Sequence, residues 1–182
     1  MGKESNQELL EISNNRLKNA FILKDSYDPF FIAEIGINHN GSIDLVEQLI
    51  DMAVSSNCDA VKFQKRTIEL VYNESTLNSE RQSPWGTTTR EQKEGLELSL
   101  EEYKHIDEYC KKKGILWSAS AWDGESQEFL RQFNLPFNKV ASAMATNDVF
   151  LEKVAQEKKP TFVSTGMMSN EDIEKIIKVF NK

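Results

Sequence analysis

The chain has 182 residues, 39% hydrophobic and 28% charged, a balance typical of a globular domain with a substantial core. Its formal net charge of −7, without a basic cluster, argues against nucleic acid or an anionic membrane as the main partner. No apolar run approaches the roughly 20 residues of a membrane span, and the N-terminus does not read as a secretory signal. Cys58 and Cys110 lie far apart without CxxC spacing, so we expect two reduced core thiols in a cytoplasmic protein.

Taken in chain order, residues 1–28 are polar with a weak helical stripe, and residues 21–23 are expected to form a short strand or a plug. After them, apolar strands and amphipathic helices alternate. The expected strands cover residues 29–35, 59–64, 115–120, 136–142 and 160–166. The expected helices cover residues 43–56 and the stretches that follow the predicted caps Ser99, Asp123, Asn147 and Ser169.

The polar stretch 65–98 interrupts this alternation and contains the sequence PWGT at residues 84–87. An insertion of that length in a compact domain is usually functional or disordered.

Five βα units in strict alternation predict parallel strands joined by right-handed helical crossovers. Either an open doubly wound sheet or an incomplete (β/α)8 TIM-type barrel fits this pattern. Every expected strand ends in polar or ionisable side chains, namely Glu34, Lys62, Gln64, Ser118, Ser120, Lys139, Ser142, Ser164 and Thr165. Barrel enzymes build sites from many strand ends, and no GxGxxG or GxxxxGK[ST] motif indicates a nucleotide-binding open sheet. The pattern therefore favours an α/β barrel, with about five of its units in this chain.

The strand-end side chains suit an anionic ligand. At one barrel mouth, Lys62 and Lys139 would offer two cations, and small hydroxyls would come from Ser120, Ser142 and Ser164. Such a set fits a dianionic phosphate and a carboxylate. The alternatives are structural: a serine at a strand end is often a satisfied turn residue, a lysine often extends to water, and Glu34 would anchor a neighbouring loop.

Two other classes of site find little support. A single histidine is weak evidence for a metal, and His39 suits a hydrogen bond in its turn better, while His105 falls on the exposed side of a predicted helix. No Ser-His-Asp arrangement is apparent. Cys58 precedes its strand, which argues against a thiol nucleophile.

Five motifs together resemble the sialic acid synthase family, which comprises N-acetylneuraminate synthases and their legionaminate, pseudaminate and N-acylneuraminate-9-phosphate relatives. These are IAEIGINHNG (32–41), VKFQK (61–65), PWGT (84–87), KVAS (139–142) and STGM (164–167). The resemblance divides the chain into an N-terminal extension, 1–28, and the N-terminal portion of a synthase barrel, 29–182. One departure is that Ala143 and Met144 follow Ser142, where the family usually has glycine and an acidic residue.

The resemblance implies a carbon–carbon bond-forming transferase that condenses phosphoenolpyruvate with an N-acylated mannosamine-type sugar, giving a sialic (nonulosonic) acid and phosphate. A divalent metal, Mn²⁺ or Mg²⁺, polarises the sugar aldehyde in that chemistry, and its histidine ligands lie on later strands outside this chain. The full-length form is expected to be a homodimer. By motif match, the catalytic residues are Glu34 and Lys62, and the substrate-binding residues are Gln64, Ser120, Lys139, Ser142, Asn147 and Ser164. Within this set Glu34 and Gln64 would face the sugar.

Two alternatives stay open at this point. The chain could be a non-catalytic half-barrel that binds an anionic metabolite or pairs with another chain. It could also belong to a different phosphoenolpyruvate-condensing 3-deoxy-keto acid synthase, which the first motif disfavours.

Overall fold

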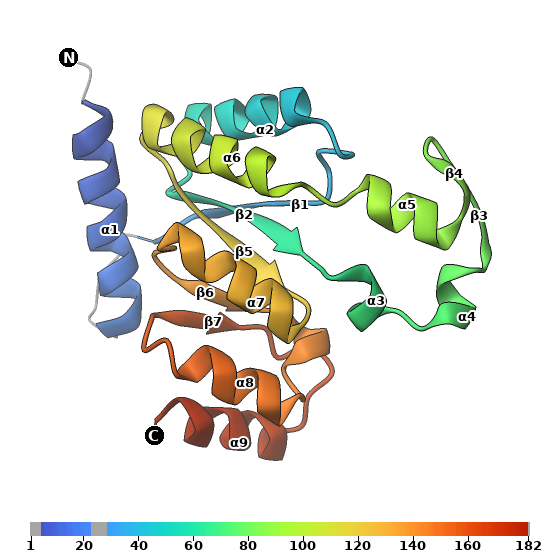
Figure 1. Cartoon of the computed structure of the whole chain (residues 1–182). Coiled ribbons are helices and arrows are strands. Elements are labelled where there is room, and N and C mark those ends of the chain that lie inside the picture. Colours follow the sequence, from blue (N-terminus) through green and yellow to red (C-terminus); the bar gives the residue numbers. More distant parts are fainter. Residues whose placement is uncertain (1–4, 23–28, 182) are drawn as a thin grey trace. The chain divides into compact units, whose positions relative to one another are not determined.

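The computed structural model describes residues 5–22 and 29–181, which form an α/β structure (Figure 1). The chain divides into two compact units. Unit 1 comprises Met1–Phe63 and Leu96–Ser118, and unit 2 comprises Gln64–Gly95 and Ala119–Lys182. The predicted alternation of strands and helices is confirmed within the described residues. No helix among them is both long and apolar enough to cross a membrane.

Unit 1 is built on a three-stranded sheet of order β1-β2-β5, in which β1 runs parallel to β2. Its helices α2 and α6 lie side by side (Figure 1). The bounds are α1 Asn6–Ile22, β1 Ile32–Gly36, α2 Ile43–Ser55, β2 Ala60–Lys65, α6 Leu100–Lys113 and β5 Leu116–Ala121, the last residues of β2 and β5 belonging to unit 2.

The helices of unit 1 begin and end where their cap residues predict. The Ser99 side chain accepts a hydrogen bond from Glu102 N, and the Glu102 carboxylate binds back to Ser99 N, which completes the predicted capping box of α6. Gly114 ends α6 at φ +73°, a left-handed conformation that glycine adopts without steric cost. Tyr103, Ile106 and Cys110 are fully buried and form the inward face of α6.

Cys58 and Cys110 are both free thiols, as predicted. Burial raises the pKa of the Cys110 thiol well above its ordinary value, with a smaller contribution from the nearby Asp107 carboxylate. Cys110 is therefore an inert core residue.

The N-terminal stretch differs from the expectation. Phe21 and Ile22 lie in the last turn of α1, so the predicted short strand is wrong there, and Leu23 lies outside the described residues. Only Ser13 and Leu17 of α1 are buried. A helix with so narrow a buried face leaves a faint apolar pattern in the sequence, and tertiary contacts stabilise it.

Unit 2 contains a parallel strand pair, β6 with β7, and an antiparallel hairpin, β3 with β4. Helices α8 and α9 pack together. The bounds are α3 Ile68–Val71, α4 Glu74–Leu77, β3 Glu80–Ser83, β4 Gly86–Thr88, α5 Thr89–Gly95, α7 Gly124–Leu130, a 3-10 turn Arg131–Phe133, β6 Asn138–Val140, a 3-10 turn Ser142–Met144, α8 Asp148–Ala155, β7 Thr161–Val163 and α9 Asn170–Phe180. The predicted caps Asp123, Asn147 and Ser169 are confirmed.

The insertion predicted at 65–98 is folded rather than disordered. Arg90 binds Glu74 at 2.8 Å and Glu69 at 3.3 Å, which links α5 to α3 and α4. Gly95 lies so close to the Trp85 ring that a Cβ there would come within 2.2 Å of it. These contacts explain how a mostly polar stretch holds one conformation, whereas its functional role stays a prediction.

Candidate functional site

In unit 1 the strand ends bring Glu34 and Lys62 together. Glu34 on β1 is the register partner of Lys62 on β2, and Lys62 Nζ lies 2.7 Å from Glu34 Oε2. The Lys62 side chain is 4% exposed and that of Glu34 is 59% exposed. A buried ammonium therefore meets a carboxylate that solvent and solutes can reach.

The strand β1 changes register directly after Glu34. Ala33 pairs with Val61 and Glu34 with Lys62, but Gly36 pairs with Phe63, so one residue of β1 is bulged out. Gly36 has φ +59°, which favours glycine. Bulges re-aim neighbouring side chains and are frequent beside active sites.

The turn after β1 is held by its own polar side chains. His39 is buried, and its Nδ1 accepts a hydrogen bond from Gly41 N at 3.1 Å. Asn38 Nδ2 donates to Ile35 O at 2.9 Å. The predicted turn role of His39 is confirmed. His105 is exposed, as predicted, and lies 2.6 Å from Glu47.

In unit 2 the ends of β6 and β7 bring three predicted residues together. Lys139 Nζ donates to Ser164 Oγ at 2.6 Å and to Val140 O at 3.3 Å. Ser142 lies next to Gly166. A Cβ atom added to this glycine would be 3.6 Å from the Cβ of Ser142, which is an ordinary van der Waals contact. A cation and two hydroxyls thus gather at the carboxyl ends of two parallel strands, which is a suitable arrangement for an anion.

The other predicted site residues are Gln64, Ser120 and Asn147. Gln64 follows Lys62 by two residues on β2 and is half-buried, and Ser120 is 1% exposed in β5. Asn147 caps α8, its Oδ1 accepting from Phe150 N at 3.0 Å. The cap uses one of the two lone pairs of this oxygen, so the second lone pair and the amide nitrogen of Asn147 can contact a substrate.

The sequence analysis missed two buried carboxylates. Asp59 directly precedes β2 and is 2% exposed. Glu157, whose side chain is 7% exposed, accepts from Gln127 Nε2 at 2.8 Å, Arg131 Nε at 2.9 Å and Asn138 Nδ2 at 3.0 Å. For Asp59, the available signal was a carboxylate at the start of an apolar strand, where burial requires a partner.

The architecture is an α/β fold similar to that of sialic acid synthetase. The structure superposes on N-acetylneuraminic acid (sialic acid) synthetase from Leptospira borgpetersenii, solved in complex with citrate, with a TM-score of 0.72 and 27% identity over 84% of this chain and 50% of that one. The chain belongs to the NeuB family, whose model matches residues 49–182. The family predicted from the motifs is confirmed.

Curated relatives agree with this assignment. The chain is 37% identical to human N-acetylneuraminate-9-phosphate synthase over 152 residues, which are 82% of this chain and 42% of that protein. It is 32% identical to N,N'-diacetyllegionaminic acid synthase of Legionella pneumophila over 88% of this chain and 46% of that protein. The chain thus spans somewhat less than half the length of these relatives.

Proposed function

We propose that this chain is part of a cytoplasmic enzyme that condenses phosphoenolpyruvate with an N-acylated mannosamine-type sugar, giving a nonulosonic acid and phosphate. Membership of the NeuB family and the names of its relatives support the reaction class. The observation that carries the proposal in the structure is the group formed by Lys139, Ser142 and Ser164. The chain would supply about five units of a (β/α)8 barrel, and the full-length enzyme would be a homodimer.

Each group of residues has a role in this proposal. In unit 2, Lys139, Ser142 and Ser164 bind an anionic group of phosphoenolpyruvate, because a lysine held by a hydroxyl presents an oriented positive charge. In unit 1, Lys62 binds an anionic substrate group, and Glu34 binds hydroxyl or amide groups of the sugar. Ser120, Gln64 and Asn147 complete the substrate contacts, with Gln64 on the sugar.

The chemistry requires a new bond from C3 of phosphoenolpyruvate to the sugar aldehyde carbon, addition of water at C2, and loss of phosphate. The residues named above contribute binding, charge neutralisation and orientation. The family resemblance implies Mn²⁺ or Mg²⁺ as well. Within residues 5–22 and 29–181, no three or more His, Cys, Asp or Glu side chains group to hold a metal ion. The described residues therefore do not by themselves fit a metal ion.

Ligand-induced stabilisation tests the proposal. Phosphoenolpyruvate at about 100 times its dissociation constant is expected to stabilise the folded protein by about 2.7 kcal/mol, a rise of several degrees in melting temperature. Lys62→Ala is expected to abolish this rise. Lys113→Ala is the matched control, because Lys113 belongs to the same unit and pairs with Asp51 at 2.6 Å. An unchanged rise in Lys62→Ala would contradict the assignment of Lys62 to the anion.

Phosphate release distinguishes an enzyme from a binding protein. Release that requires both phosphoenolpyruvate and an N-acylmannosamine-type sugar supports the synthase. A melting shift without release from the full-length protein would instead favour binding of an anionic metabolite without condensation.

A further inference from the structure

Both the side chain and the backbone of Asp59 make hydrogen bonds at the amino ends of the strands in unit 1. Its Oδ2 accepts a hydrogen bond from Phe31 N at 2.8 Å, just before β1 begins. Its Oδ1 accepts from Ser13 Oγ at 3.2 Å and from Arg16 Nη1 at 3.1 Å, both on α1. Its backbone N donates to Phe31 O at 2.9 Å, and its carbonyl accepts from Leu116 N, at the start of β5. One residue therefore joins all three strands and α1.

These contacts fix a register. Asp59 holds Phe31 beside it, and each strand then advances three residues to the Glu34–Lys62 pair. The pairs between them are Ile32 with Ala60 and Ala33 with Val61, and the register shifts directly after Glu34. The in-register part of β1 and β2 is therefore the segment between Asp59 and the candidate site.

We propose that Asp59 is a positioning residue that sets the register of β1 against β2 and thereby places Glu34 opposite Lys62. The functional side of this inference rests on the proposed function. A slip of one residue would put Ala33 or Ile35 opposite Lys62 and would turn the Glu34 side chain to the other face of the sheet. Burial does little to resist such a slip, because both faces of β2 are buried from Ala60 to Phe63 and no solvent-exposed face distinguishes one register from another.

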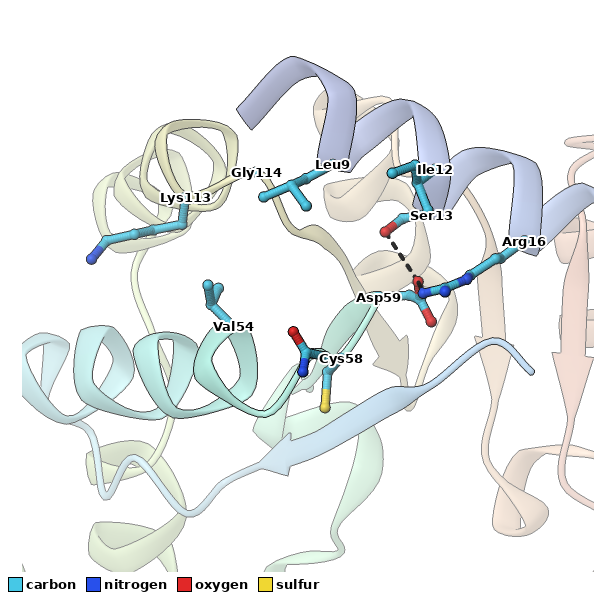
Figure 2. Close-up of a pocket in the computed structure, with 10 residues that line it drawn as sticks. Leu9, Ile12, Ser13, Arg16, Val54, Cys58, Asp59, Lys113 and Gly114 are labelled. Carbon is cyan, nitrogen blue, oxygen red and sulfur yellow. Dashed lines mark hydrogen bonds and ion pairs between the residues drawn. The ribbon is translucent and has the colours of Figure 1, made fainter. Parts of the chain in front are cut away.

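Helix α1 also contributes to holding Asp59 in place, through Ser13 and Arg16. Figure 2 shows Ser13 and Arg16 extending from α1 toward Asp59 beside a cavity of about 440 Å³, which residues of α1, the end of α2 and the end of α6 line. Since the cavity leaves α1 incompletely packed, its polar contacts matter for its attachment. The buried Asp59 carboxylate in turn requires the Arg16 charge and the Ser13 hydroxyl to offset its desolvation. Loss of Arg16 should therefore weaken the hold of Asp59 on Phe31.

A double-mutant cycle between Glu34→Gln and Lys62→Met, measured by denaturant unfolding of the full chain, tests the inference. The cycle is run with Asp59 intact and again with Asp59→Asn. With Asp59 intact, the coupling should change the folding equilibrium constant by a factor of about ten, within the range for contacting charged residues. With Asp59→Asn, this coupling factor should fall close to one. A coupling that stays near ten while stability drops would overturn the proposal, since Asp59 would then be merely structural.

Asp107→Asn is the matched control. Asp107 lies in the same unit and accepts a hydrogen bond from Trp117 Nε1 of β5 at 2.9 Å. It is a suitable control because this hydrogen bond does not join β1 to β2. Its loss should lower stability and leave the Glu34–Lys62 coupling near ten. Should Asp59→Asn fail to fold, Arg16→Met keeps the test decisive. It should lower the coupling at least threefold, and an unchanged coupling would count against the inference.

Hydrogen exchange gives a second readout. At equal global stability, amides of residues 32–34 should exchange at least tenfold faster in Asp59→Asn than in Asp107→Asn, and equal rates would contradict a register role.

Binding of phosphoenolpyruvate separates the two proposals. If Lys62→Ala retains the melting shift but the coupling still depends on Asp59, the assignment of Lys62 to the anion fails and the positioning role stands.

Discussion

The two units secure their strand-end lysines in different ways. In unit 1, Lys62 is nearly fully buried and pairs with the carboxylate of Glu34. In unit 2, Lys139 is half-buried and donates to the hydroxyl of Ser164. A carboxylate neutralises the ammonium that it binds, whereas a hydroxyl orients it without cancelling its charge. An anion that approaches Lys62 must therefore compete with Glu34, and Ser164 imposes no such competition at Lys139.

Each unit also anchors its lysine strand with a buried carboxylate near the amino end. Asp59 stands three residues before Lys62 on the chain, and Glu157 binds Asn138, the residue before Lys139. The carboxylates differ in what they join: Asp59 links strands and α1, while Glu157 links β6 to Gln127 and Arg131 of the preceding helical segment. Similar strand-end lysines thus depend on different long-range contacts.

The largest expected effect is on unit 2. Glu157→Gln should lower the free energy of unfolding by about 2–3 kcal/mol, because hydrogen bonds to a charged acceptor are lost or weakened. Urea unfolding measures this change. Glu125→Gln, an exposed residue of α7, is the control and should stay within about 0.5 kcal/mol of wild type. Equal stability of the two variants would show that β6 does not depend on Glu157.

The same carboxylate predicts a pH dependence. Burial acts to raise the pKa of Glu157, but the hydrogen bonds from Gln127, Arg131 and Asn138 outweigh it, and the pKa lies below its ordinary value of 4.5. Because the pKa is lowered on folding, ionised Glu157 contributes its full stabilisation above pH 4.5. This stabilisation is lost as the pH falls through the pKa of the folded state. The stability gap between wild type and Glu157→Gln should therefore close only in acid. A gap that closes near neutral pH would contradict this assignment.

Lys139→Met should weaken phosphoenolpyruvate binding by at least tenfold, about 1.4 kcal/mol, since an oriented charge is lost from the anion group. Isothermal titration calorimetry measures it. Lys153→Met is the control, because Lys153 is also half-buried in unit 2 and donates to a backbone carbonyl, Gly124 O, at 2.7 Å. Equal affinities in the two variants would remove Lys139 from the proposed site.

The smallest expected effect is that of Glu34→Gln, which tests whether Glu34 competes with an anion for Lys62. Removing the competing carboxylate should raise the affinity for inorganic phosphate about threefold, a modest effect because the Glu34 side chain is exposed and solvent screens its charge. Glu47→Gln, which removes the partner of His105, is the control and should leave the affinity unchanged. A weaker affinity in Glu34→Gln would mean that Glu34 orients Lys62 toward the anion rather than competing with it.

Much of the fold was predictable from short-range patterns. The capping box at Ser99, the caps at Asp123 and Asn147, and the stop at Gly114 each depend on groups within a few residues of one another. The predicted strands at 136–142 and 160–166 are shorter in the structure, as β6 and β7, because the apolar composition of a segment does not reveal where hydrogen bonding to a neighbour ends.

Other features could not be predicted from patterns. Helix α1 buries too few residues to give a clear apolar stripe, and its contacts reach Asp59, which is 46 residues from Ser13. The fold of residues 65–98 depends on ion pairs of Arg90 with glutamates 16 and 21 residues away. Such contacts leave no periodic signal in the sequence.

The sequence alone was enough to predict that lysines, serines and a glutamate lie at or just after the ends of strands, where they are available for an anionic substrate. Tertiary structure decided which of them meet: Glu34 with Lys62, and Lys139 with Ser164. The physical reason is that strand order and register set these pairs. Because β2 is buried on both faces from Ala60 to Phe63, no exposed face specifies its register, and in the proposal above the contact of Asp59 with Phe31 supplies it.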